Sequence, residues 1–235
     1  MAANLLGMPD LSISTMEDAL IDARRITDAS SLPLMVDIDT PAGAAPSTSR
    51  TIRSFIKAGV AAVHIEDQVR QKRCGHRPNK ERVLKKRDGG PREGRRRCAH
   101  GRRPWKASTR RSIRAGAYVE AGTDMIFPEA IKTLDDYCRF KAAVRVPILA
   151  NLTEFGSTPF FIVDELKSAN VDIALYCCGA YRAMNAAALN FYETVKRDGT
   201  QKAAVETMQT RVDLYKYLGY HEYENKLDQL FTSRK

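Results

Sequence analysis

The stretch VAAVHIED, residues 60–67, is the most informative guide to the fold of this chain. Its first six residues have the pattern of a buried β-strand, and two carboxylates follow at the end of that strand. Similar short apolar runs alternate with amphipathic helical patterns along the chain, at 33–38, 60–65, 125–127, 146–151 and 171–176. Because strands that alternate with helices form a parallel sheet with crossover helices, we assign the chain to the α/β class.

Helical spacing of apolar residues predicts the elements between and after these strands. Ser14 and Glu17 fit a capping box at the start of the first helix, with apolar residues at helical spacing behind it. Long helical patterns follow the last strand, at 180–197 and 200–217, with a shorter one at 221–231. With 235 residues the chain is long enough to bury its own core, and we predict a single domain, 1–235.

Residues 72–76, Lys-Arg-Cys-Gly-His, surround one thiol with cationic side chains. Positive charge beside Cys74 stabilises its thiolate and makes proton exchange near neutral pH feasible. The loop follows the strand 60–65, and reactive groups just beyond a strand lie at the active face of a parallel α/β enzyme. A buried structural cysteine is the alternative interpretation. The polar and basic neighbours favour a catalytic Cys74, with Lys72, Arg73 and His76 around it.

Two carboxylates, Asp37 and Asp39, are separated by one residue at the end of the strand 33–38. Alternate residues of a strand point to the same face, so these two side chains are expected to lie together. They offer the hard oxygen ligands that Mg²⁺ prefers. The spacing alone fits a pair of solvated loop carboxylates as well.

Seven segments together resemble one family. They are SLPLMVDID at 31–39, HIEDQ at 64–68, KRCGHRPNK at 72–80, FPEA at 127–130, PILANLTEFG at 147–156, YRAMN at 181–185 and MQTR at 208–211. In this order they resemble the 2-methylisocitrate lyases, which belong to the isocitrate lyase and phosphoenolpyruvate mutase superfamily. The resemblance implies a TIM-type (β/α)8 barrel with C-terminal helices. It also implies Mg²⁺-dependent cleavage of 2-methylisocitrate to pyruvate and succinate, with isocitrate lyase and other superfamily activities as alternatives.

The same resemblance implies roles for individual residues. Mg²⁺ would be bound by Asp37 and Asp39, with Glu66 in the outer shell through water. Cys74 would act as the general acid that protonates the departing succinate, while Lys72, Arg73 and His76 tune its thiol and bind carboxylates. The remaining matches to substrate-binding positions are Gly75, Glu129, Asn151, Leu152, Thr153, Arg182 and Arg211.

The segment 84–113 departs from the family pattern. Residues 81–114 hold 14 of the 38 Lys and Arg residues but only three of the 28 Asp and Glu residues, so the rest of the chain is close to neutral. The segment shows neither helical nor strand periodicity, although a barrel strand should fall between Val83 and Arg114. The family's first strand would lie before Met1. The barrel is therefore predicted to be incomplete, with two strands missing or scrambled.

Two explanations of this basic segment remain open. A shift by one nucleotide allows the codons of 88–98 to encode MVDRVKAAVDA, an ordinary amphipathic helix. We therefore favour a frame-shifted stretch from which several residues, including the expected strand, are also missing. We then expect 84–112 to be disordered or poorly packed, and the enzyme to be impaired. The alternative is a genuine basic loop. The competing hypothesis for function is that the basic segment binds a polyanion such as nucleic acid. The segment has one aromatic residue, Trp105, and lacks a recognised nucleic-acid-binding motif, so we do not expect nucleic acid as a partner.

The remaining expectations concern location and assembly. No run of 18 apolar residues occurs, and Met1 is not followed by a signal-peptide pattern, so we predict a protein without a membrane anchor. Five cysteines without paired spacing fit the reducing cytoplasm. Apolar stripes on the last helices, 200–231, predict a homo-oligomer, which the family resemblance suggests is a tetramer.

Overall fold

A computed structural model describes residues 5–9, 11, 13–39, 45–66, 96–101 and 108–232. The pattern of contacts divides the chain into two units, Met1–Gly179 and Ala180–Lys235. Each unit is described by itself below, and the predicted single domain remains a prediction.

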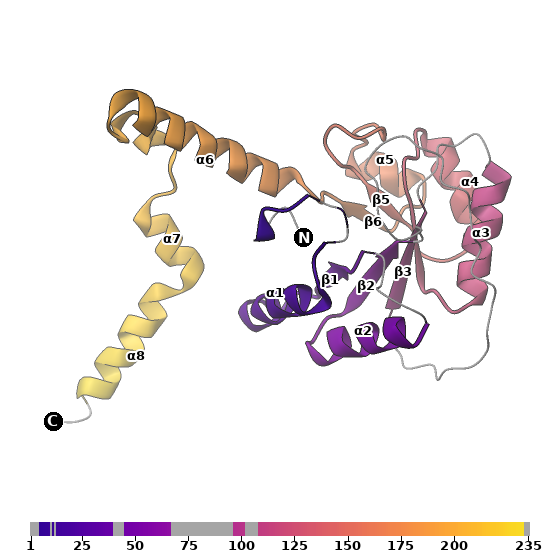
Figure 1. Cartoon of the computed structure of the whole chain (residues 1–235), viewed down its shortest axis with the longest axis horizontal. Helices are drawn as coiled ribbons and strands as arrows, with labels where there is room; N and C mark the ends of the chain where they lie inside the picture. The colour runs from indigo at the N-terminus through magenta and orange to yellow at the C-terminus, as the bar shows by residue number, and fades with distance from the viewer. Residues whose placement is uncertain are drawn as a thin grey trace. The chain divides into compact units, whose positions relative to one another are not determined.

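Among the described residues of the first unit, six strands lie in a parallel arrangement (Figure 1). They are β1 (Met35–Asp37), β2 (Ala62–Glu66), β3 (Arg96–Gly101), β4 (Met125–Pro128), β5 (Leu149–Asn151) and β6 (Ile173–Leu175). The first four form one sheet in sequence order, and β5 pairs with β6. A parallel bridge, Ile126↔Ile148, and a 3.0 Å hydrogen bond from the Ile126 N–H to the Pro147 carbonyl join β4 to β5. The predicted α/β class is therefore confirmed.

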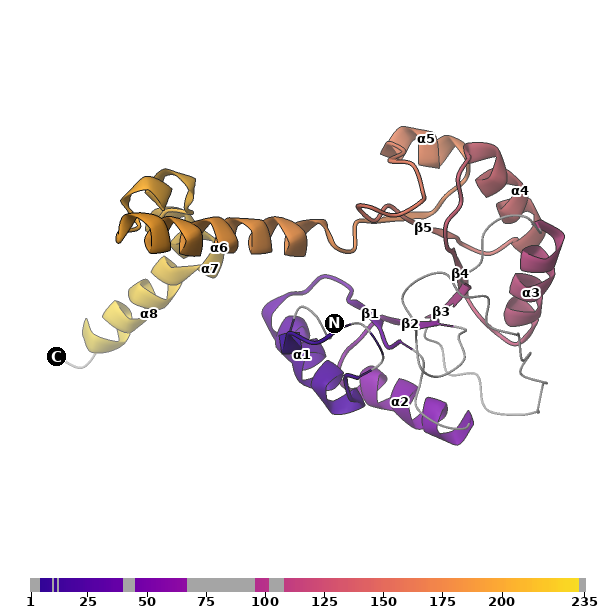
Figure 2. The same cartoon turned by 45° about the horizontal axis from the view of Figure 1, so that its top comes forward.

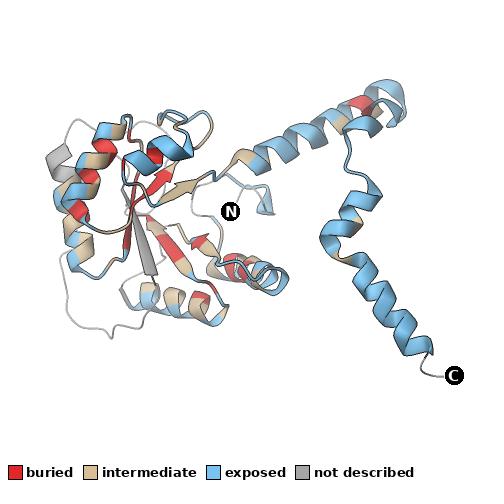
Figure 3. Cartoon of the chain, turned by 180° about the vertical axis from the view of Figure 1, so that it is seen from behind, coloured by how far each residue is buried: buried red, intermediate tan, exposed pale blue. Residues whose placement is uncertain are grey.

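Helices cover the outside of these strands (Figure 2). They are α1 (Met16–Ala29), α2 (Ala45–Lys57), α3 (Ser108–Glu120), α4 (Leu134–Val144) and α5 (Val163–Ser168). One apolar cluster joins α1 and α2 to the first strands through Leu20, Phe55 and Val63. A larger cluster joins α3 and α4 to β4 and β5, and the buried faces of these helices turn toward the strands (Figure 3).

The opposite face of the sheet has an apolar cluster of its own. Met125, Phe127 and Leu149 are buried there, and Met35 and Leu175 pack against them. Because side chains alternate along a strand, the residues between them belong to the outer clusters instead. Met35 of the first strand and Leu175 of the last thus meet in one cluster, which requires the sheet to curl as it does in a barrel. No pairing of β6 with β1 is recorded among the described residues, so closure of the barrel remains a prediction.

The strand β3 corrects the expectation for the basic segment. No strand was predicted within 84–113, yet β3 pairs in parallel with both neighbours, for example Val63↔Arg97 and Ala99↔Ile126. A central strand is held by backbone hydrogen bonds on both sides, and these do not depend on an apolar side-chain pattern. The absence of an internal strand is therefore not confirmed. Residues 84–95 and 102–107 lie outside the described residues, so a frame shift or disorder there is untested.

Local hydrogen bonds also correct two predicted helix boundaries. Thr15 and Asp18, rather than Ser14 and Glu17, form the capping box of α1, with the Asp18 N–H donating to Thr15 Oγ1 at 3.2 Å and the Thr15 N–H donating to Asp18 Oδ2 at 2.8 Å. The predicted helix 200–217 is two elements, a 3₁₀ helix, η2 (Lys202–Thr207), and α7 (Arg211–Leu218). The interruption follows from Thr210, whose side chain caps α7 by accepting a hydrogen bond from the Asp213 N–H at 3.1 Å.

The second unit contains most of α6 (Gly179–Asp198), then η2, α7 and α8 (Tyr220–Thr232). Among its described residues only Thr194 and Ala204 are buried. Large apolar side chains are exposed along all of its α-helices, including Met184, Leu189, Tyr192, Val212, Tyr217, Leu218, Tyr223, Leu227, Leu230 and Phe231. This unit therefore buries almost no apolar core of its own. In the described part of the chain, no helix combines the length and apolar character needed to cross a bilayer.

Candidate metal and substrate site

Parallel pairing brings the carboxyl ends of β1 and β2 to one edge of the sheet. The register pairs Asp37 with His64, so Glu66 lies two residues farther along β2. The N–H of Glu66 donates to the carbonyl of Asp39 at 2.9 Å, which fastens the loop after β1 to the end of β2. Polar side chains from two strands are thereby held at the same edge, where parallel α/β folds bind ligands.

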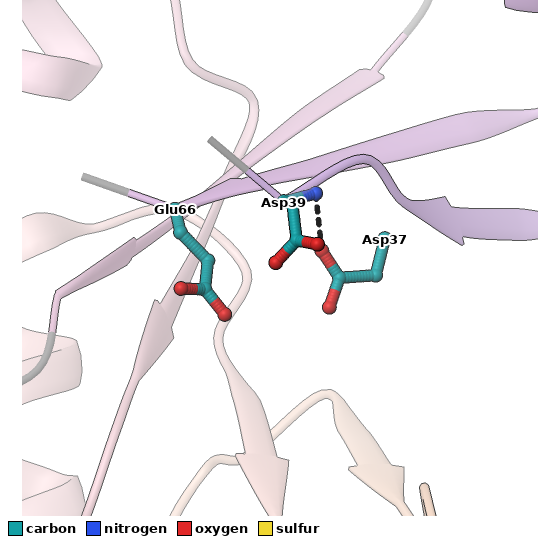
Figure 4. A group of neighbouring side chains, drawn as sticks. All are labelled: Asp37, Asp39 and Glu66. Carbon is teal, nitrogen blue, oxygen red and sulfur yellow. Dashed lines mark hydrogen bonds between the residues drawn. The ribbon is translucent and has the colours of Figure 1, made fainter. Parts of the chain in front are cut away.

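Three carboxylates gather at this edge (Figure 4). Asp37, Asp39 and Glu66 each offer one oxygen, and these atoms all lie within 4.8 Å of one another. The Glu66 residue is only 4% exposed, whereas Asp37 is exposed. Three negative charges this close repel one another, and buried charges in proteins are stabilised by pairing or by a bound cation. Hard carboxylate oxygens in this arrangement fit a divalent cation such as Mg²⁺.

The path of Asp39 differs from the one expected from its spacing. The strand β1 ends at Asp37, and Asp39 has a left-handed backbone with φ of 54°. Its N–H donates to Asp37 Oδ1 at 2.8 Å. The two carboxylates are therefore brought together by a turn, and not by alternation along a continuous strand. Aspartate tolerates this left-handed conformation better than most residues do.

His64 supports the carboxylate cluster and was given no role in the sequence analysis. Its ring is buried, and Nδ1 lies 3.4 Å from Asp37 Oδ1. The ring also packs against Phe127 of β4, with centroids 4.7 Å apart. These contacts fix the position of the imidazole and, through it, that of Asp37. The signal that could have indicated a role for His64 is the presence of a histidine in the otherwise apolar strand pattern 60–65.

A second polar group lies at the ends of β4, β5 and β6. Asn151 Nδ2 donates to Glu129 Oε2 at 3.4 Å, while Asn151 Oδ1 lies 3.3 Å from the Cys177 thiol. The same thiol lies 3.2 Å from Thr153 Oγ1. The amide of Asn151 is thus oriented from both sides. Three of the predicted substrate-binding residues, Glu129, Asn151 and Thr153, come together here with Cys177, whose role the sequence did not indicate.

Tyr137 lies in the apolar layer near this group. It is fully buried in the cluster beneath α4. Burial first, and then the negative charge of Glu129, raise the pKa of the Tyr137 hydroxyl far above its ordinary value. The hydroxyl therefore stays protonated at any physiological pH.

The other predicted site residues fall in different places. Leu152 is buried in the core and its N–H donates to the Leu175 carbonyl at 2.9 Å. Arg182 and Arg211 are exposed residues of the second unit, on α6 and α7. The basic loop, Lys72, Arg73, Cys74, Gly75 and His76, lies outside the described residues. The roles of all these residues remain predictions.

Carboxylates at the carboxyl edge of a parallel α/β fold are typical of enzymes that bind a divalent cation and a small substrate there. A family model described as phosphoenolpyruvate phosphomutase matches residues 1–93. The 2-methylisocitrate lyase of Escherichia coli is 50% identical over 243 residues, covering 98% of this chain and 82% of that enzyme. The enzyme of the same name from Shewanella oneidensis is 51% identical, covering 97% and 82%. The chain belongs to the 2-methylisocitrate lyase family.

Solved structures agree on the fold. A 2,3-dimethylmalate lyase, described as a member of the PEP mutase and isocitrate lyase superfamily, matches with a TM-score of 0.79 and 27% identity over 97% of this chain and 80% of that one. A phosphonopyruvate hydrolase in complex with oxalate and Mg²⁺ matches with a TM-score of 0.74 over 95% of this chain and 81% of that one. At 20% identity, the second likeness concerns the fold alone.

Proposed function

We propose that this chain cleaves 2-methylisocitrate to pyruvate and succinate. The observation that carries the proposal is the identity of about half of all aligned residues with 2-methylisocitrate lyases over nearly the whole chain. Two groups of side chains support the proposal. One is the carboxylate cluster after β1 and β2, and the other is the group of amide and hydroxyl side chains after β4, β5 and β6. A tricarboxylic substrate needs fixed donors for its carboxylates, and a carbon–carbon cleavage needs stabilisation of developing negative charge.

The proposed cofactor is Mg²⁺, held by Asp37 and Asp39, with Glu66 contributing through water. The mutual distances within 4.8 Å and the burial of Glu66 support a cation at this place. When bound, Mg²⁺ would draw electron density from the oxygen of the 2-oxo acid end and so stabilise the charge that develops there. His64 would hold Asp37 in position through its contact at 3.4 Å.

The chain's own polar residues would orient the substrate and move a proton. Asn151 and Thr153 would donate hydrogen bonds to a carboxylate, and the hydrogen bond from Asn151 to Glu129 fixes the amide before the substrate arrives. As the carbon–carbon bond breaks, the substrate hydroxyl would lose its proton to water or a base and become the keto group of pyruvate. The electron pair of the broken bond stays on the carbon of the departing succinate, Cys74 would transfer its thiol proton to that carbon, and the thiolate would regain a proton from water before the next turnover. The role of Cys74 rests on the sequence, because the residue lies outside the described part.

We also propose that the protein is a cytoplasmic homo-oligomer, a tetramer as the family resemblance suggests. The support is the second unit, which exposes apolar residues such as Val212 and Leu227 and buries almost none of them. Exposed apolar surface of this extent favours a contact with another chain. Arg182 and Arg211 match substrate-binding positions of the family, and we propose that they bind substrate carboxylates.

Substrate selectivity tests the proposed reaction. Purified protein would be assayed with 2-methylisocitrate, isocitrate and 2,3-dimethylmalate, and kcat/KM compared among the three. We expect the highest kcat/KM with 2-methylisocitrate. A higher value with either of the other two would assign the chain to a different activity of the superfamily.

A further inference from the structure

Two adjacent cysteines stand at the end of β6, beside the proposed substrate-binding residues. Cys177 and Cys178 are both free thiols, and their sulfur atoms lie 3.6 Å apart. Cys177 is exposed and Cys178 is half-buried, so the pair is accessible from the carboxyl edge of the sheet. The established family membership and the proposed cleavage reaction assign no role to either thiol.

The separation of the two sulfur atoms fits one particular kind of ligand. Zinc in a tetrahedral site binds thiolate sulfur at about 2.3 Å, which places two thiolates of one ion about 3.8 Å apart. The observed 3.6 Å is close to that separation. A disulfide fits less well, because adjacent Cα atoms are about 3.8 Å apart and disulfides span about 4.4–6.8 Å between Cα atoms.

The surroundings of Cys177 supply further donors. Asn151 Oδ1 and Thr153 Oγ1 lie 3.3 Å and 3.2 Å from its sulfur. A carbonyl or hydroxyl oxygen beside two thiolates is a suitable additional ligand for a cation of intermediate softness. Burial raises the pKa of the Cys177 thiol, so a metal ion would have to displace a proton at neutral pH and would bind more tightly as the pH rises.

We propose that Cys177 and Cys178 form a chelating site for one thiophilic divalent cation of the zinc and cadmium kind. Binding exchanges two thiol protons for two metal–sulfur bonds, so each ion bound releases up to two protons and no electron is transferred. The site is distinct from the carboxylate cluster in donor type, since soft thiolates select Zn²⁺ and Cd²⁺ over Mg²⁺.

The position of this site gives it a consequence. An ion held by Cys177 would lie against the oxygen atoms of Asn151 and Thr153, and would reorient the amide and hydroxyl groups that are proposed to donate hydrogen bonds to a substrate carboxylate. This part rests on the proposed function. We therefore expect thiophilic cations to inhibit the cleavage reaction, and to do so through Cys177 and Cys178.

Direct binding of Cd²⁺ tests the site without any reference to activity. Cadmium thiolates absorb in the near ultraviolet, so titration of the reduced protein reports both affinity and sulfur ligation. We expect one such site in the wild type and a loss of affinity exceeding the roughly 10–100-fold that outer-shell changes cause, in both Cys177→Ser and Cys178→Ser. Cys138→Ser, on α4, is the matched control and should retain the affinity.

Peptide mapping of the wild type keeps the test independent of whether a variant folds. Bound Cd²⁺ should protect the peptide that contains Cys177 and Cys178 from a maleimide, and leave the Cys138 peptide as reactive as before. Equal labelling of Cys177 and Cys178 with and without Cd²⁺, or unchanged Cd²⁺ affinity in both Cys177→Ser and Cys178→Ser, would overturn the proposal.

Inhibition of the cleavage reaction by Cd²⁺ should also be weaker in Cys177→Ser and Cys178→Ser, when the rate of each variant with Cd²⁺ is divided by its own rate without Cd²⁺. If the wild type has no lyase activity at all, the proposed function fails while the absorption and mapping results still decide the cadmium site.

Discussion

The first strands and the last strand place chemically different metal-binding groups at the carboxyl edge of the sheet. After β1 and β2, the groups are carboxylates with oxygen atoms within 4.8 Å of one another, and after β6 they are two thiols 3.6 Å apart. Asn151 and Thr153 adjoin the thiols, and Asn151 also contacts Glu129 after β4. The edge therefore carries two different groups: a carboxylate cluster that could hold a hard cation, and a group of amide, hydroxyl and thiol side chains linked by hydrogen bonds. A substrate with several carboxylates can use both.

The largest effect is expected from removal of a carboxylate. Asp37→Ala should lower kcat/KM by more than about 100-fold and abolish the response to added Mg²⁺, because a direct ligand is lost. Activity measured across a Mg²⁺ titration checks this. Asp135→Ala is the matched control, since Asp135 forms only an exposed ion pair with Arg139. A normal Mg²⁺ titration of Asp37→Ala would exclude this residue as a ligand.

A smaller effect should follow at the other end of the edge. Asn151→Asp keeps the shape of the side chain but removes the donor to Glu129 and adds a negative charge beside it. Loss of a hydrogen bond to a charged group costs about 1.5–3 kcal/mol, so kcat/KM should fall roughly 10–100-fold. Steady-state kinetics check this, with the Mg²⁺ requirement retained. Loss of the Mg²⁺ response in this variant would mean that the two sites are not separate.

A substitution in the second unit is expected to change the oligomeric state more than the catalytic rate. Leu227→Asp places a charge on an exposed apolar position of α8 and should dissociate the oligomer if α8 contacts a neighbouring chain. Light scattering measures the mass in solution. Asn225→Asp, two residues earlier on the same helix, adds the same single negative charge at another exposed position and is the control. A wild-type protein that is monomeric would contradict the proposed homo-oligomer.

The smallest effect is expected at the start of α1. Thr15→Ala removes the cap and should lower the free energy of unfolding by about 1 kcal/mol, whereas Ser14→Ala should have almost no effect. Hydrogen bonds from Thr15 to the Asp18 carboxylate lower the pKa of that carboxyl, so the part of the stabilisation that depends on the carboxylate is present above the unfolded-state pKa and is lost as the pH falls through the lowered value. Urea unfolding of both variants at neutral and acidic pH checks both points. Equal effects of the two substitutions would contradict the observed cap.

Sequence reasoning succeeded where a local pattern determines the structure. The five predicted strands occur in order, and Asp37, Asp39 and Glu66 gather as expected. It failed where the structure depends on backbone contacts between residues far apart in the sequence or on a local turn. The strand β3 is held by two neighbours, and Asp39 reaches Asp37 through a left-handed turn. The place of Cys177 beside Asn151 could not be predicted, because it depends on the pairing of β5 with β6.

The basic segment 84–113 remains the least explained part of the sequence. The alignment with the Escherichia coli enzyme spans 243 residues, more than the 235 of this chain, so that relative contains residues here or elsewhere that this chain lacks. This supports the proposal of a frame-shifted stretch with missing residues but does not locate them. The nucleotide sequence across codons 83–114 decides between a frame shift and a genuine basic loop.

Release of pyruvate from 2-methylisocitrate, measured with Mg²⁺ and after chelation, tests the central claim most directly. We expect pyruvate and succinate in equal amounts with Mg²⁺ present, no release after chelation, and recovery when Mg²⁺ is restored. An equal rate with and without the chelator, or no cleavage by folded protein saturated with Mg²⁺, would contradict the proposed metal-dependent lyase.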